Sequence, residues 1–215
     1  MKTVGNLDKI QLVDEEGREV RGAIFDHQYE LWDPAQEQLT LILDPARVKT
    51  GLKANLEFGR ALRPGRKYRL QAGALEDAEG RIMPPGIIKE FYVGQADDRA
   101  PDTEQWEIEV PRVGGWQPLA IHFPGMLDHF SLRQRVVLVN ENGQKVRGEV
   151  RIGKREESWH LLPDAPWPAG NYTLYVHARL EDPAGNNLNG LFDHKVGSLK
   201  YPTEDHVVTI PITIE

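Results

Sequence analysis

The chain has 215 residues, of which 40% are hydrophobic and 27% are charged, as is typical of a globular protein rather than a disordered one. Its net charge of −7 argues against a nucleic acid or an anionic membrane as partner, because both require a basic face. It contains no cysteine and no run of about 18 apolar residues, so the sequence predicts no disulfide, no thiolate metal site, no cysteine nucleophile and no membrane span.

Short alternating runs between prolines and glycines predict β-strands. The 15 prolines and 20 glycines leave little room for a long helix. In chain order, the predicted strands with one buried face are 67–72, 119–123, 135–140, 172–177 and 206–214. Short helical turns are expected after Asp44, which precedes a proline, and after Asp128. Many short strands with regular turn signals indicate an all-β sandwich or barrel.

Two stretches of the first half recur in the second half. LVDEEGREVRGAI, residues 12–24, matches LVNENGQKVRGEV, residues 138–150, and each is expected to form a strand, a turn ending in glycine and a second strand. RPGRKYRLQAGALEDAEG, residues 63–80, matches PAGNYTLYVHARLEDPAG, residues 168–185, in the same order. The stretch between the copies is polar and unpatterned. We therefore expect two domains, 1–95 and 106–215, joined by a linker at 96–105.

The second repeat carries a recognisable pattern from Trp167 to Asn186: an alanine-glycine turn, a tyrosine, an alternating strand and then LEDPAGN. This pattern resembles that of bacterial Ig-like domains of the S-layer SbsA type. The first repeat departs from it at Glu79 and Arg81, so its corner is expected to be less tightly hydrogen-bonded. The resemblance implies two tandem Ig-like β-sandwich domains of a bacterial cell-envelope or secreted protein, periplasmic or extracellular.

The residues of the pattern predict a structural corner without reference to any family. A tyrosine at this point can pack its ring inward and bond its hydroxyl to nearby backbone, while an aspartate caps the turn and a glycine supplies a positive φ. The residues with these roles are Tyr68 and Tyr172, Asp77 and Asp182, and Gly80 and Gly185.

The two repeats differ at their start. The second repeat opens with PLAIHFPGML, residues 118–127, whereas the first has no counterpart, since Met1 falls near the position of Met126. We expect the first domain to lack its opening strand, with a strand or a leader encoded upstream. An Ig-like sandwich without that strand has an open edge, which we expect a neighbouring chain or its own loops to cover.

Two groups of residues are weak candidates for metal binding. Glu181, Asp182, Asn186 and two further asparagines supply oxygens, but their spacing is not that of an EF-hand, so a structural turn is favoured over a calcium loop. The pairs Asp128–His129 and Asp193–His194 are candidates for a zinc or nickel site, but no HxH or HExxH spacing accompanies them. We therefore expect no metal and no cofactor.

Catalytic motifs are not found in the sequence. None of the serines stands in a GxSxG setting, and no glycine-rich loop precedes a helix. The tryptophans Trp116, Trp159 and Trp167 have two interpretations: packing in the core, or stacking on a sugar or peptide from an exposed face.

Together these patterns predict a non-catalytic Ig-like structural or interaction module that binds a protein partner or a cell-surface polymer. One alternative is a carbohydrate-binding accessory module that uses exposed tryptophans. Another is a metal-dependent hydrolase. Exposure of the tryptophans would favour the first alternative, and convergence of three histidine or carboxylate side chains would favour the second.

Overall fold

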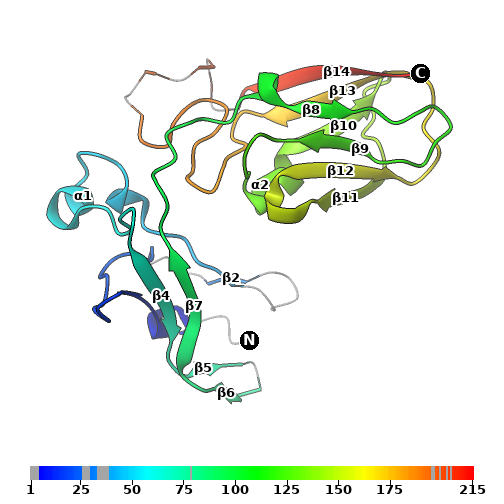
Figure 1. Ribbon diagram of the computed structural model, residues 1–215. Helices are drawn as coiled ribbons and strands as arrows, with labels where there is room; N and C mark the ends of the chain where they lie inside the picture. Colours follow the sequence, from blue (N-terminus) through cyan, green and yellow to red (C-terminus); the bar gives the residue numbers. More distant parts are fainter. Residues whose placement is uncertain are drawn as a thin grey trace. The chain divides into compact units, whose positions relative to one another are not determined.

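The computed structural model describes residues 5–25, 30–32, 39–77, 79–194, 197–198, 200–201, 203 and 205–215. The chain divides into two compact units, Met1–Ala96 and Asp97–Glu215, which are considered separately below (Figure 1). Most regular structure is antiparallel β-strand, so the all-β class is confirmed. Within the described ranges, no helix is long and apolar enough to cross a membrane.

The second unit consists of two antiparallel sheets around one core. The first sheet has the order β10 (Val136–Asn140), β13 (Gly170–His177), β14 (Val207–Ile214). The second has the order β11 (Gly148–Ile152), β12 (Ser158–Pro163), β9 (Leu119–His122), β8 (Glu107–Glu109). The helices are η3 (Thr103–Gln105), α2 (His129–Arg135) and η4 (Lys154–Glu156). Both sheets contribute to a single cluster of nineteen buried side chains.

The alternation of apolar residues explains this core. On β13, Tyr172, Leu174 and Val176 are buried, at every second position, as the period of a strand requires. On β12 the buried residues are likewise Trp159 and Leu161. Antiparallel pairing then places these side chains on the inner faces of the two sheets.

The first unit consists of one larger sheet and two short hairpins. The sheet has the order β1 (Ile10–Asp14), β4 (Lys67–Ala72), β7 (Gly86–Tyr92). The hairpins are β2 (Leu31–Trp32) with β3 (Leu39–Thr40), and β5 (Leu75–Glu76) with β6 (Ile82–Met83). The helices are η1 (Leu7–Lys9), η2 (Pro45–Arg47) and α1 (Lys53–Phe58). Seven of the eight described buried apolar residues form two separate clusters, one of four and one of three, and Val13 belongs to neither.

The sequence repeat is also a structural repeat. In the first unit Leu12 pairs with Leu70, and in the second Leu138 pairs with Leu174. The tyrosines correspond in the same way, since Tyr68 pairs with residue 14 and Tyr172 with residue 140. The strands β1, β4 and β7 therefore match β10, β13 and β14 in order, and β1 with β4 matches β10 with β13 in register, whereas the pairing of β4 with β7 shifts register between Leu70 and Gln71.

Three local features differ from, or extend, the sequence expectations. Asp44 and Asp128 cap their helices as expected, by accepting hydrogen bonds from Ala46 N and Ser131 N, but α2 continues to Arg135. The helix α1 was not expected. Residues 97–105, expected as linker, are part of the second unit, where Asp97 O accepts a hydrogen bond from Asn186 Nδ2. Met1, used to place the expected missing strand, lies outside the described residues.

Candidate functional site

The same pattern of turn hydrogen bonds occurs four times in the part of the chain that the structure describes. Its copies are residues 14–18, 77–81, 140–144 and 182–186, with the sequences DEEGR, DAEGR, NENGQ and DPAGN. In each copy one side-chain oxygen of the first residue accepts the N–H groups of the third and fifth residues. The glycine N–H donates to the carbonyl of the first residue, with φ between 74° and 83°. Only glycine adopts that φ without strain.

In the second-unit copy at 182–186 the first and last residues, Asp182 and Asn186, are buried. Asp182 is 6% exposed, and its oxygens accept hydrogen bonds from Ala184 N, Asn186 N and Asn186 Nδ2. Asn186 also accepts a hydrogen bond from Phe192 N and donates one to Asp97 O. Burial raises the pKa of the Asp182 carboxyl, and the hydrogen bonds from residues 184 and 186 oppose that rise. The side-chain oxygens of Asp182 and Asn186, considered as calcium ligands, therefore already accept hydrogen bonds in and around the turn.

The first-unit copy at 77–81 is exposed. The Arg81 side chain donates to Asp77 Oδ2 at 2.6 Å, and this hydrogen bond lowers the pKa of the Asp77 carboxyl. The backbone hydrogen bonds match those of the other copy. Arg81 occupies the position at which Asn186 makes additional hydrogen bonds to Phe192 and Asp97. The corner of the first unit is therefore less tightly hydrogen-bonded to other segments, as the sequence predicts.

Both corner tyrosines are buried and bonded to backbone. The Tyr172 hydroxyl donates to Pro168 O at 3.0 Å, and the Tyr68 hydroxyl accepts from Arg63 N at 3.1 Å. Tyr172 also meets the Trp167 ring edge-on at a centroid distance of 5.9 Å. This is the arrangement that the sequence analysis expects of both residues.

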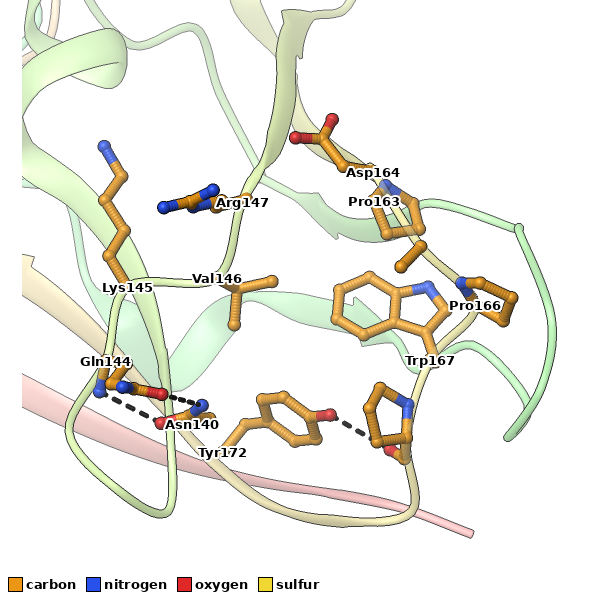
Figure 2. Close-up of a pocket in the computed structure, with 12 residues that line it drawn as sticks. Asn140, Gln144, Lys145, Val146, Arg147, Pro163, Asp164, Pro166, Trp167 and Tyr172 are labelled. Atoms are coloured by element: carbon orange, nitrogen blue, oxygen red, sulfur yellow. Dashed lines mark hydrogen bonds between the residues drawn. The ribbon is translucent and has the colours of Figure 1, made fainter.

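A hollow lies beside each tyrosine corner. In the second unit it has a volume of about 530 Å³ and is lined by the 140–144 turn, Lys145, Arg147 and the segment 163–168 (Figure 2). The counterpart in the first unit has a volume of about 390 Å³ and is lined by the 14–18 turn and several arginines. The rings of Trp167 and Tyr172 are only 2% and 6% exposed, so the hollow of the second unit presents no free aromatic face.

The tryptophan-stacking interpretation is wrong for two of its three residues. Trp159 is 1% exposed and Trp167 is 2% exposed, because both lie within the core of the second unit. The indole N–H of Trp167 is bonded to Gln117 O. Only Trp116, which is 60% exposed, has a ring available for stacking.

The candidate metal ligands lie in separate places and have other partners. Asp128 caps α2, while His129 Nδ1 lies 3.2 Å from Glu156 Oε1. His194 Nδ1 lies 2.7 Å from Leu191 O, on the loop that also carries Asp193. In the part of the chain that the structure describes, no three or more histidine, cysteine or acidic side chains are grouped to hold a metal ion.

The structure brings together one polar cluster that the sequence analysis missed. Ser158 Oγ lies 2.9 Å from His160 Nε2 on β12, and His122 of β9 lies 3.2 Å from Glu109 Oε1 of β8. The two imidazole rings are 6.0 Å apart. Burial lowers the pKa of His160, and His122 adds to that effect. The i, i+2 spacing of Ser158 and His160 was a signal that both lie on one face of a strand.

The geometry thus gives most candidate polar residues a role in turns, caps and corners. The Ser158 cluster lies on the polar positions of β12, which alternate with the buried Trp159 and Leu161. No protein-family model matches the chain, and no curated protein matches it.

Proposed function

We propose that the chain is a non-catalytic Ig-like interaction module, in which the second unit is a rigid scaffold and the first unit presents a surface to a protein partner. A bacterial envelope or secreted protein is the proposed setting, in keeping with the resemblance of the second repeat.

The observation that carries this proposal is the distribution of apolar side chains between the units. Among the described residues, the first unit exposes eleven large hydrophobic side chains and the second exposes seven. The most exposed in the first unit are Leu56 at 75%, Ile82 at 65% and Tyr92 at 63%. Contiguous exposed apolar side chains mark interaction surfaces, whereas scattered single ones are normal. The eleven include two pairs of chain neighbours, Ile42 with Leu43 and Ile82 with Met83. The turns and tyrosine corners support the role of a scaffold.

Site-specific photo-crosslinking in the native host tests this proposal. A photoreactive residue replaces Ile82 on the first unit, and the matched control replaces Asn142, which is exposed in a turn of the second unit. We expect a discrete protein adduct from position 82 and none from position 142. Absence of an adduct at 82, or equal labelling at both positions, would refute a partner surface on the first unit.

A further inference from the structure

The segment that follows β3 has one bonded side and one bare side. Ile24 pairs with Leu43, and two hydrogen bonds flank this pair, from Phe25 N to Ile42 O and from Asp44 N to Ala23 O. In an antiparallel pair the backbone groups of successive residues point to opposite sides. The groups of Leu41 and Leu43 therefore point away from this pairing. Outside the ladders of the named strands, no backbone hydrogen bond between described residues uses the N–H or C=O of Leu41 or Leu43.

In the second unit a strand occupies the matching position. Val150 is the repeat counterpart of Ile24 and pairs with Leu161, so Leu43 corresponds to Leu161, and residue 41 to Trp159. Leu161 pairs with Leu119 of β9, and Trp159 pairs with residue 121 of the same strand. In the described part of the first unit, no strand stands in the place of β9.

The strand β9 also closes the core, and this contribution has no counterpart in the first unit. Leu119 and Ile121 are 0% exposed and belong to the cluster of nineteen. On the corresponding hairpin of the first unit, Ile24, Leu39 and Leu41 are only partly buried. Four further large side chains are about two-fifths exposed: Phe25 at 41%, Leu31 at 41%, Ile42 at 39% and Leu43 at 41%. The nearby core cluster has only three buried members.

We propose that the outer side of residues 41–43 accepts an extended segment of a second polypeptide, with large apolar residues at alternate positions as in β9. This inference rests on the proposed interaction function and names its contact. Main-chain hydrogen bonds to Leu41 and Leu43 supply affinity, and the alternate side chains cover the apolar residues of the hairpin. The occupant is a strand of β9 chemistry because the repeat shows which residues this edge takes when it is filled.

Peptides with the sequence of residues 116–125 test the proposal on the full chain. Backbone groups of Leu119 and Ile121 face β12, whereas those of Ala120 face β8. An N-methyl group at the Ile121 position should therefore block binding, and one at the Ala120 position should not. Amide NMR with hydrogen exchange is the readout. We expect the unmodified and Ala120-methylated peptides to slow exchange at Leu41 and Leu43 by on the order of tenfold or more, with no slowing by the Ile121-methylated peptide.

Two variants of the chain separate backbone pairing from side-chain contact. Leu43→Pro removes the outward N–H, and proline is tolerated where a strand's N–H faces away from its sheet. Leu43→Ala retains that N–H and is the matched control. Peptide binding should be lost in Leu43→Pro and retained, though weakened, in Leu43→Ala, and an unchanged exchange pattern elsewhere in the first unit shows that the proline variant is folded.

Several results would overturn the proposal. Equal binding of the three peptides, or no slowing at Leu41 and Leu43, would exclude strand addition at this edge. If these amides are protected in the free chain, and if that protection rises with protein concentration, the edge is covered by a second copy of the chain instead. Protection in a dilute monomer would mean that the chain covers its own edge. An adduct at position 82 without peptide binding would leave the interaction function standing and reject only this contact.

Discussion

The two units share a three-stranded sheet and a tyrosine corner, yet they differ in how well they enclose a core. In the second unit β9 lies between β8 and β12, and Leu161 is 3% exposed. In the first unit Leu43, at the corresponding position, is 41% exposed. The same turn chemistry and register therefore produce one cluster of nineteen buried side chains and two of four and three. Turns and registers can repeat without repeating the core, because the core depends on how many strands each sheet contains.

The largest expected effect concerns Leu161 and Leu43. Leu161→Ala leaves a cavity in a filled core and should lower the free energy of unfolding of the second unit by about 2–5 kcal/mol. Leu43→Ala removes a side chain that is 41% exposed and leaves no enclosed cavity, so it should cost less, about 1 kcal/mol. Urea unfolding followed by NMR, with separate signals for each unit, measures both. Similar losses at the two positions would contradict the difference in packing.

Hydrogen exchange compares the stability of the units without substitution. We expect the amides of β1 to exchange faster than those of β10, by on the order of a hundredfold, because global opening of the first unit exposes fewer buried contacts. The paired residues Leu12 and Leu138 are the matched probes, since each lies in the middle of the same register. Equal protection of both strands would show that the first unit needs no further strand.

The tyrosine corners should contribute similarly in the two units. Tyr172→Phe leaves Pro168 O without its donor, and Tyr68→Phe leaves Arg63 N without its acceptor. Each substitution should lower the free energy of unfolding of its own unit by about 1 kcal/mol, with the somewhat larger loss at Tyr172. Thermal denaturation of both variants beside the wild type measures this. An unchanged melting temperature for Tyr172→Phe would remove the corner as a source of stability.

Lowering the pH should change the contributions of Asp182 and Asp77 to stability in opposite directions. Burial raises the folded-state pKa of Asp182, so its contribution to stability is full below the unfolded pKa and is lost as pH rises through the folded pKa. The Arg81 hydrogen bond lowers the pKa of Asp77, so its contribution is present above the unfolded pKa and is lost as pH falls through the folded value. The stability difference between wild type and Asp182→Asn should therefore grow as pH falls from 7 towards about 3, the range in which carboxyl groups titrate. The difference for Asp77→Asn should shrink. Parallel slopes would contradict this assignment.

The smallest expected effect is that of metal ions. Addition of calcium or zinc should leave the melting temperature nearly unchanged, since the oxygens of Asp182 already accept three hydrogen bonds. A site occupied at a hundred times its dissociation constant would add about 2.7 kcal/mol. A rise of several degrees that EDTA reverses would reopen the calcium interpretation of residues 180–190.

Much of the local structure was predictable because it is decided within a few residues. Alternation identified β4, β9, β10, β13 and β14 nearly to their ends, and the caps at Asp44 and Asp128 lie where the sequence places them. The turn residues and the corner tyrosines likewise follow from short-range chemistry: an aspartate that reaches its own backbone, a glycine at positive φ and a hydroxyl near a chain reversal. The repeat itself is visible in the amino-acid sequence.

The burial of individual side chains and the exposure of strand edges were decided only by the tertiary structure, because they depend on strands far apart in the chain. Trp159 is buried because β9 and the opposite sheet cover it, whereas Trp116 has no such cover. His122 and His160 meet only because β9 pairs with β12. Among the described residues no strand pairs with the outer edge at Leu41 and Leu43, and which strands pair with a segment is a property that no local pattern encodes. Burial and edge exposure are set by long-range pairing, and for that reason the sequence could describe each strand but not what lies on either side of it.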